Sequence, residues 1–420
     1  LISSQGLNNN QQSTLGPINT GLSNGNSDSG FVALSTALIN QGSGLASALD
    51  QLSPQKLQVW DRIAFDNFGF TASQVDNHLA GQRNGQSGFD TSGLQVLDPS
   101  MLPVLAQIQH SLLAWNPPAH SNTISDSSTP IANGKPAPLN ENNRSSFFIS
   151  GAAVLADIGH DDNVAHSDYT TTGVTAGADY RLDKSWTVGG LFSYGHTDAT
   201  LDHDGSKSRV DSYSPGVYAS YADHGWYANA LAAYNYNSYN ENRAIPFFGT
   251  TANGSTNGNQ YDANLDGGYE FRHGDFTFGP TAALQYVHLD IDGFTENGAG
   301  AANLAINNQN ADSLRSRLGG QFRYQAVLCN GKVTAAPHFG ASWQHEYMDN
   351  SRSITSQFSE FGGGSFNVST SSPERESALL DFGFDTRWNN SLDLFLGYQA
   401  QVGQSDFFAQ SVQAGLKINF

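Results

Sequence analysis

The C-terminal two thirds of the chain alternate between apolar and polar residues. The last segment shows the pattern most strictly, with Val412, Ala414, Leu416, Ile418 and Phe420 alternating with Gln413, Gly415, Lys417 and Asn419. A period of two predicts a β-strand that has one apolar and one polar face.

Twelve segments between residue 145 and the end follow this pattern. They cover about 145–158, 169–182, 186–200, 208–222, 225–240, 258–272, 275–290, 308–325, 331–347, 375–388, 392–404 and 408–420. Each has 13 to 18 residues, whereas strands of soluble proteins usually have about five or six. A tilted strand that crosses a membrane needs about 9–11 residues in the apolar zone plus its rims, so the lengths favour membrane-spanning strands.

Connections of two or three residues alternate with longer ones along this region. The short ones lie near 183–185, 223–224, 273–274, 329–330 and 389–391, and most of the intervening ones are longer, such as 241–257 and 348–374. Short turns on one side and long loops on the other are typical of outer-membrane barrels. The sequence therefore predicts an all-β fold, a transmembrane antiparallel up-and-down β-barrel of about 12 strands, preceded by a short helical and linker region.

The two faces of the predicted strands have opposite chemistry. In a membrane barrel the apolar face contacts lipid and the charged face lines the lumen. The charges that we expect in the lumen are Asp179, Arg181, Asp266, Glu270, Arg315, Arg317, Arg323, Asp381, Asp385 and Arg387. A soluble sandwich would show the same alternation, but the long strands and the small apolar residues Ala228, Ala230 and Ala232 argue against it.

Aromatic residues gather at the short-turn ends of the predicted strands. They are Tyr180, Trp186, Trp226, Phe271, Phe276, Tyr324 and Trp388. Aromatic rings favour the membrane–water interface, so we expect these residues to form a belt at that level.

The first 144 residues divide into three regions by composition. Residues 1–30 are low-complexity and polar, residues 31–115 carry helical patterns, and residues 116–144 form a Pro/Ser/Asn linker. Ser53 and Pro54 open one predicted helix over 54–83, and Asp98 and Pro99 open another over 98–115.

The composition excludes several classes of protein. The chain has 420 residues and a net charge of −19, which disfavours a partner made of nucleic acid. It contains no apolar run of about 18 residues, so a helical membrane span is not expected. A single cysteine, Cys329, excludes an intramolecular disulfide and a cysteine-based zinc site. Because the chain begins at Leu1 within a polar segment, we expect it to be the C-terminal piece of a longer protein.

With twelve alternating segments and a terminal aromatic residue, residues 145–420 resemble the autotransporter β-domain, the translocator of type V secretion. The segment from Leu45 to Ser53 reads LASALDQLS and precedes a predicted helix. It is similar to the passenger-to-translocator junction of that family. The resemblance covers about 31–83 and 145–420.

This resemblance implies a function and a set of partners. The barrel would lie in the bacterial outer membrane, in contact with its lipid, and would export an N-terminal passenger to the cell surface through or beside itself. Residues Ala414, Leu416, Ile418 and Phe420 would form the signal that the outer-membrane barrel assembly machinery reads. A helix would then remain in the lumen. Of the two predicted helices we expect 98–115 to take this place, since it lies nearer the first strand.

The sequence contains no motif that predicts an enzyme. No Gly-x-Ser-x-Gly motif and no Gly-x-x-x-x-Gly-Lys motif occurs, and we expect no cofactor. His160, Asp161, Asp162 and His166 fall in one predicted outer loop, where a solvated acidic loop is favoured over a cation site. In the family that this chain resembles, some members cut the passenger free with carboxylates or asparagines of the lumen. The candidates here are Asp266, Glu270, Asp381 and Asp385 with Asn142 and Asn143, but ordinary ion pairs with nearby arginines are favoured.

A porin-like diffusion channel with a periplasmic N-terminal domain is the alternative function. A porin would begin its barrel soon after the signal peptide. The 144 residues that precede the first predicted strand therefore favour the translocator.

Overall fold

The computed structural model describes most of the chain outside the linker. The described residues are 1–83, 145–159, 166–201, 204–329, 333–348, 352–370, 374–388, 392–405 and 407–418. The predicted helix over 98–115 and the linker over 116–144 lie outside them.

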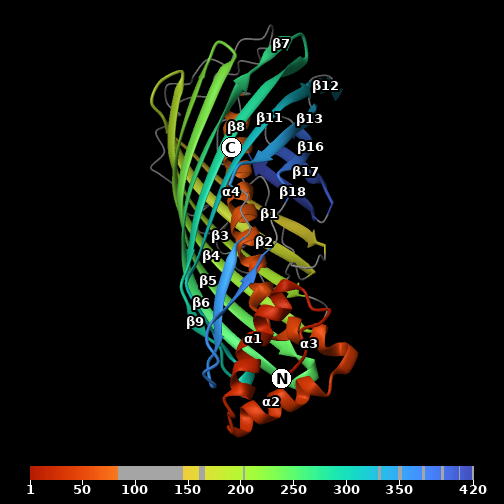
Figure 1. Cartoon of the computed structure of the whole chain (residues 1–420). Coiled ribbons are helices and arrows are strands. Elements are labelled where there is room, and N and C mark those ends of the chain that lie inside the picture. The colour runs from red at the N-terminus through yellow and green to blue at the C-terminus, as the bar shows by residue number, and fades with distance from the viewer. Residues whose placement is uncertain are drawn as a thin grey trace.

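Twelve long antiparallel strands close into a barrel (Figure 1). They are β1 (Ser145–Ile158), β2 (Ser167–Arg181), β3 (Trp186–Leu201), β4 (Ser206–Asp223), β5 (Trp226–Ile245), β6 (Thr250–Tyr269), β8 (Phe276–Ile291), β11 (Gln309–Tyr324), β13 (Val333–Glu346), β16 (Glu376–Trp388), β17 (Leu392–Gln404) and β18 (Phe407–Ile418). Each strand pairs with its neighbour in the chain, and β1 pairs with β18 to close the ring. The predicted fold class and strand number are confirmed.

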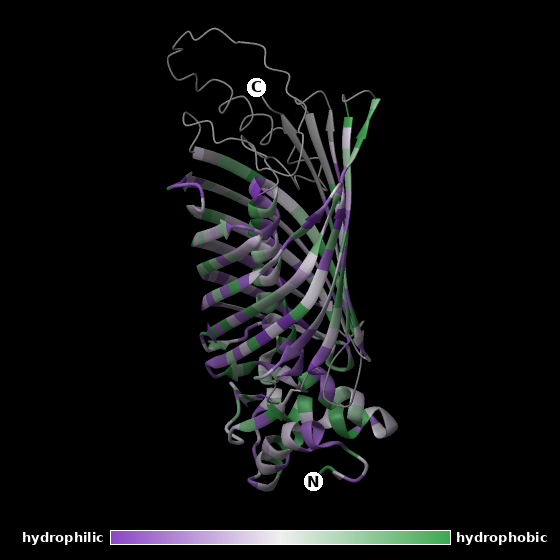
Figure 2. Cartoon of the chain, turned by 90° about the horizontal axis from the view of Figure 1, so that it is seen from above, coloured by the Kyte–Doolittle hydropathy of each residue, from purple (hydrophilic) through white to green (hydrophobic). Residues whose placement is uncertain are grey.

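Alternation along each strand separates an outer from an inner face, and polar and apolar residues accordingly follow one another along the ribbons (Figure 2). On β5, Ala230 and Tyr234 are exposed on the outer face. Directly before Ala230 in sequence, the buried Asn229 accepts a hydrogen bond from Ser220 of β4 (2.7 Å) and donates one to Asp266 of β6 (2.8 Å). Inner polar groups therefore satisfy one another across strands, as buried polar groups must.

Two aromatic rims bound the apolar band of the outer face. On β3 and β4, Trp186 lies opposite Tyr221 at the short-turn end, and Tyr194 lies opposite Tyr213 eight residues further along each strand. Eight residues span about 26 Å along a strand, or about 20 Å across a membrane at the usual barrel tilt. This is close to the roughly 25 Å apolar band of outer-membrane barrels.

The N-terminal helices pack over the long-loop end of the barrel (Figure 1). They are α1 (Asn9–Ser23), α2 (Ser29–Ile39), η1 (Gly42–Gly44) and α3 (Leu45–Leu52). Beside them lie the short elements η4 (Pro246–Phe248), β9 (Phe294–Thr295), η5 (Gly300–Ala302), β10 (Leu304–Ile306), β14 (Ser353–Phe358) and β15 (Phe366–Ser369). The four strands β9, β10, β14 and β15 form a second, small sheet. We call residues 1–52 together with these loop elements the cap.

Polar side chains of α1 bind the edge of the small sheet. Asn10 donates to the backbone oxygen of Ser369 (2.8 Å) and accepts from its backbone N–H (2.9 Å). Ser13 makes the same two kinds of bond with Asn367 (2.6 and 3.2 Å). The polar segment over residues 1–30 thus contains a folded helix, because its amide and hydroxyl groups replace a missing neighbouring strand.

The cap is joined to the barrel by apolar packing and by one buried arginine. The ring of Phe31 in α2 lies 4.6 Å from the ring of Phe361, which stacks on Phe358 of β14. Arg243, at the far end of β5, donates to the Glu296 carboxylate (2.9 and 2.5 Å) and to the backbone oxygen of Gln51 in α3 (2.6 Å). This arginine therefore ties the barrel wall, the loop after β8 and the N-terminal helices together.

Two helical segments follow the cap. A 3₁₀ turn, η2 (Pro54–Gln58), leads into α4 (Val59–Arg83), which runs through the barrel (Figure 1). Among the described residues, no helix combines the length and the apolarity needed to cross a membrane. Two further short strands, β7 (Phe271–His273) and β12 (Ala326–Leu328), extend the wall at the short-turn end.

Gly189 leaves room for an aromatic ring on the inner wall, which gives a first testable prediction. A Cβ at Gly189 would lie 2.3 Å from the ring of Tyr218, whereas a Cβ at the neighbouring Gly190 would meet nothing closer than 3.6 Å. We expect Gly189→Ala to lower the free energy of unfolding by about 1–3 kcal/mol, because overpacking displaces the ring. Gly190→Ala, the matched control, should have little effect. Denaturant unfolding of the purified barrel in detergent measures both, and equal stability of the two variants would contradict the prediction.

Candidate functional site

The candidate functional site is the lumen of the barrel together with the helix that occupies it. Helix α4 begins near the long-loop end, where Trp60 packs on Tyr239 with ring centroids 4.6 Å apart. It ends near the short-turn end, where the Arg83 guanidinium lies 3.9 Å from the ring centroid of Tyr227. The expectation that 98–115 would take this place is therefore corrected. The predicted helix over 54–83, observed as η2 and α4, is the one that lies in the lumen, and 98–115 lies outside the described residues.

The entry of the chain into the barrel is held by buried polar contacts. Ser53 accepts a hydrogen bond from the backbone N–H of Gln55 and caps the first turn. Lys56 forms an ion pair with Asp204 and donates to Ser206 (3.1 Å). The indole N–H of Trp60 donates to Ser208 (2.6 Å). The bonds of Lys56 and Trp60 thus fix η2 and the start of α4 to β4 and to the turn before it.

The N-terminal part of α4 contacts polar, charged and aromatic groups from opposite walls. Asp66 accepts a hydrogen bond from Tyr169 of β2 and lies 3.6 Å from the guanidinium of Arg315 on β11. Arg62 donates to Gln404 of β17 (3.0 Å). Its guanidinium lies 3.6 Å from the ring centroid of Phe407 of β18. These contacts connect one helix to both sides of the barrel.

Next to this contact, an exposed loop is tied to the turn between β17 and β18. Ser405 donates from its hydroxyl (2.6 Å) and its backbone N–H (2.9 Å) to the carboxylate of Glu374. The two bonds favour the ionised carboxylate and lower the pKa of Glu374 below its usual value.

The C-terminal part of α4 is clamped at Asp179 of β2. His78 Nε2 lies 2.6 Å from the Asp179 carboxylate, Gln82 donates to both of its oxygens (2.9 and 3.0 Å), and Tyr218 donates at 3.0 Å. The His78 ring also stacks on Phe148 of β1 at 4.2 Å. A buried carboxylate with several charge-assisted hydrogen bonds holds its partners in one geometry, so this cluster fixes the rotation of α4.

The helix does not fill the lumen completely. A cavity of about 220 Å³ lies between α4 and the wall built by β11, β13, β16 and β17. Ser73 and Asn77 line it from the helix, and polar residues such as Arg323, His338 and Asp381 line it from the wall beside apolar ones. The lumen therefore keeps open space beside the helix.

Most of the charges predicted for the lumen do lie on the inner wall or at its rim. Asp179, Glu270 and Arg315 are buried, and Arg181, Asp266, Arg317, Arg323, Asp381 and Asp385 are half-buried. The observed pairs join Glu270 to Arg83 (3.4 Å), Arg315 to Glu346 (2.9 Å) and Arg323 to Asp385 (2.5 Å). The side chain of Arg387 lies outside what the structure describes.

The lumen carboxylates considered for passenger cleavage all have partners. Asp266 accepts from Asn229 and Asn264, and Asp381 accepts from Gln399 (2.6 Å). Glu270 and Asp385 pair with arginines, as given above. Asn142 and Asn143 lie outside the described residues. No cleavage chemistry is assigned to this group.

The predicted interface aromatics lie on the outer wall wherever their side chains are described. Tyr180, Trp186, Trp226, Phe271 and Phe276 are exposed, and Tyr324 packs on Phe276 with centroids 4.8 Å apart. The side chain of Trp388 is not among the described ones. The second rim with Tyr194 and Tyr213 was not predicted, although the eight-residue offset from Trp186 and Tyr221 is visible in the sequence.

The proposed assembly signal lies on the last strand. The backbone of Ala414, Leu416 and Ile418 pairs with that of Leu396, Leu394 and Leu392 of β17. Phe420 lies outside the described residues.

Comparison with known proteins identifies the barrel. The profile of the family described as "Autotransporter beta-domain" matches residues 147–399, more than half of the chain. The chain is 24% identical over 279 residues to the esterase EstA of Pseudomonas aeruginosa, which covers 65% of this chain and 42% of the esterase. It is 28% identical over 280 residues to an extracellular serine protease of Serratia marcescens, which covers 64% of this chain and 26% of the protease. The chain thus spans less than half the length of these relatives.

A solved structure has the same fold. The translocator domain of the autotransporter NalP from Neisseria meningitidis aligns with a TM-score of 0.50 at 15% identity, covering 67% of this chain and 90% of that domain.

The clamp at Asp179 gives a second prediction. Asp179→Ala removes the partner of His78, Gln82 and Tyr218 at once, and loss of one member of a buried charged pair costs about 3 kcal/mol or more. We expect the amides of the last turns of α4 to exchange with solvent on the order of 100-fold faster. Hydrogen exchange with mass spectrometry of the folded barrel in detergent measures this. Asp198→Ala, on the outer face of β3, is the matched control, and unchanged exchange in Asp179→Ala would refute the clamp.

Proposed function

Because this chain belongs to the autotransporter β-domain family, we propose that it is an outer-membrane translocator that exports the polypeptide N-terminal to α4 to the cell surface. The observation that carries this proposal is the path of the chain. Residues 1–52 pack over the long-loop end, α4 passes through the lumen, and β1 begins at the short-turn end, where Ser145 pairs with Tyr180.

This path is the one that a chain would have after passing outward through the barrel. Long loops face the exterior in outer-membrane barrels, so the cap would lie outside the cell. The short-turn end would face the periplasm, and both the last turn of α4 and the start of β1 lie at that end.

The chemistry of the lumen suits both transit and closure. An inner wall of Asn, Ser, Asp and Arg can hydrate an extended chain while it passes. The same groups then bond to Lys56, Asp66 and His78 and retain α4 as a plug.

The partners follow from the proposed role. The exposed aromatic rims would lie at the two lipid interfaces, and the lumen charges would bind the plug. The outer-membrane barrel assembly machinery would read Ala414, Leu416, Ile418 and Phe420 on the last strand. The passenger would be the polypeptide attached before α4. Any enzymatic activity of the whole protein would reside in such a passenger, and we assign no catalysis and no cofactor to the barrel.

Surface exposure of the N-terminus tests the translocator directly. We would place a signal peptide and an epitope tag ahead of Leu1, express the chain in a Gram-negative host and add protease to intact cells. We expect the tag to be removed while the barrel stays in the outer membrane. A tag that is cut only after the outer membrane is opened would instead support a porin-like channel with a periplasmic N-terminal domain.

The terminal strand gives a separate prediction about assembly. Phe420→Ser changes the terminal aromatic residue, whereas Asn419→Ser changes the adjacent polar position. We expect the first variant to reduce the amount of folded barrel in the outer membrane several-fold and the second to leave it unchanged. The heat-dependent shift of the barrel on gels measures the folded fraction. Equal assembly of both variants would remove Phe420 from the signal.

A further inference from the structure

Three short motifs place a histidine and an aspartate side by side on the outer face of the barrel. In each, the two residues are two positions apart on one strand or at its start, near the long-loop end. The distances from His Nε2 to Asp Oδ2 are 3.2 Å for His166 and Asp168, 3.3 Å for His196 and Asp198, and 3.1 Å for His288 and Asp290. Residues i and i+2 of a strand point to the same side, which explains the recurrence.

This spacing suits two ligands of one metal ion. Zinc binds histidine nitrogen and carboxylate oxygen at about 2.0–2.2 Å in a tetrahedral arrangement. Two ligand atoms then lie about 3.4 Å apart, given those bond lengths. Each motif thus offers a nitrogen and an oxygen at nearly the right separation.

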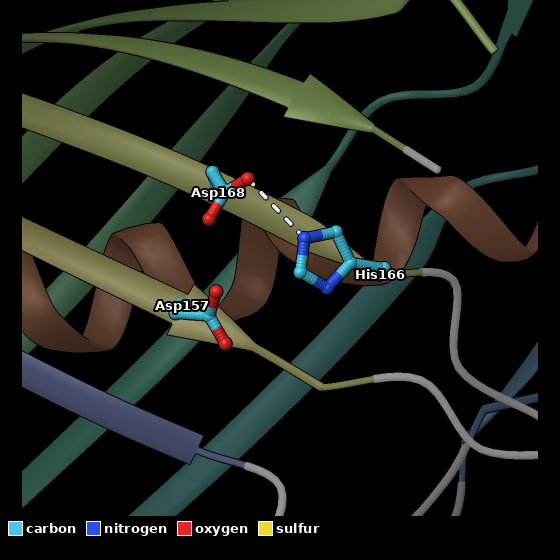
Figure 3. A group of neighbouring side chains, drawn as sticks. All are labelled: Asp157, His166 and Asp168. Carbon is cyan, nitrogen blue, oxygen red and sulfur yellow. Dashed lines mark hydrogen bonds and ion pairs between the residues drawn. The ribbon is translucent and has the colours of Figure 1, made fainter. Parts of the chain in front are cut away.

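A third ligand is present at the hairpin of β1 and β2. Asp157 of β1 lies directly opposite Asp168 of β2 in the strand register. Ligand atoms of Asp157, His166 and Asp168 all lie within 4.8 Å of one another (Figure 3). An ion bound there would contact groups of both strands at once.

The other two motifs are built differently. There the residue opposite the histidine is a carboxylate that accepts from its Nδ1, with Asp211 2.8 Å from His196 and Asp312 2.8 Å from His288. A tyrosine of the same outer face also donates to each carboxylate, namely Tyr194 to Asp211 (2.7 Å) and Tyr286 to Asp312 (2.8 Å). In these two motifs the carboxylates lie at opposite nitrogens of one imidazole, Nε2 and Nδ1, so they cannot bind the same ion together with it, and the two motifs serve as natural controls.

We propose that Asp157, His166 and Asp168 form a binding site for a divalent transition-metal ion of the zinc class. One imidazole and two carboxylates would supply three ligands, and water would complete the tetrahedron. The site is open to the exterior. Val174 of β2 lies opposite Tyr194 of the outer rim, and Asp168 lies three outward positions beyond Val174.

Binding there would act on the closure of the barrel. Asp157 also lies opposite Phe408 of β18, and the described pairing of β1 with β18 covers only residues 152–158 of β1. A metal ion would link β1 to β2 beside this short seam. Because it binds the folded barrel, it would stabilise the closed state by mass action.

Metal titration of the folded chain tests the proposal. Purified, tag-free full chain in detergent micelles would be titrated with Zn²⁺ alone by calorimetry and by competition with a fluorescent chelator. We expect Asp157→Asn, His166→Ala and Asp168→Asn each to weaken the site at least tenfold. His196→Ala and His288→Ala should leave it unchanged. The heat-dependent gel shift first verifies that each variant is folded.

The outcomes are decisive in either direction. Tight binding that is lost only in the three site variants, with a higher unfolding temperature of the wild-type barrel in Zn²⁺ but not of Asp157→Asn, supports the site. No binding to the wild type overturns it, as does equal weakening by His196→Ala. Saturation by Ca²⁺ but not by Zn²⁺ would overturn the assignment to a transition metal. None of these results depends on whether the chain exports a passenger.

Discussion

The hydrogen bonds of the backbone impose the constraint on which this structure depends. In lipid, each N–H and C=O group must find a partner within the protein, so a sheet that crosses the membrane has to close. The pairing of β1 with β18 achieves this closure. Closure turns one face of every strand toward a common interior, and twelve strands make that interior wide enough to hold a helix. The polar lumen and the need to fill it both follow from the satisfied backbone.

The helix in the lumen is held by apolar and polar contacts together. Trp60 and Phe68 of α4 are buried in one apolar cluster with residues of the inner wall, and Asp66 and His78 bond to charged groups of that wall. The cap combines the same two kinds of contact, since the rings of Phe31 and Phe361 pack together while Arg243 bonds to Glu296. Burial of apolar surface is not directional, so the polar bonds are what fix the rotation of α4 in the lumen.

The sequence predicted the barrel well because alternation is a local property of each strand. The number of strands, their approximate limits and the side of the charges could all be read from a period of two. A period of two does not show which helix occupies the lumen. The helix over 54–83 was itself predicted, but a helical pattern does not show what the helix packs against, so proximity to β1 favoured 98–115 for the lumen.

The cap was missed for a related reason. Helix α1 is rich in Asn, Gln and Ser, and composition alone marked it as a low-complexity tail. Its order comes from bonds of Asn10 and Ser13 to β15, more than 350 positions away in the chain. Contacts between such distant segments produce no periodic pattern of residues that could be recognised in the sequence.

The length of the central strands connects the membrane anchor to the cap. Strands β5 and β6 have 20 residues each, more than the apolar band requires. On β5 the outer rim lies at Tyr234, which is paired with Tyr261 of β6, and the strand continues to Ile245 beyond it. That extension carries Arg243, whose bonds to Glu296 and to Gln51 need a rigid support outside the bilayer. The part of this hairpin near the short turns therefore spans the membrane, and the part near the long loops carries the cap. The cap is thus positioned by the same sheet that forms the barrel.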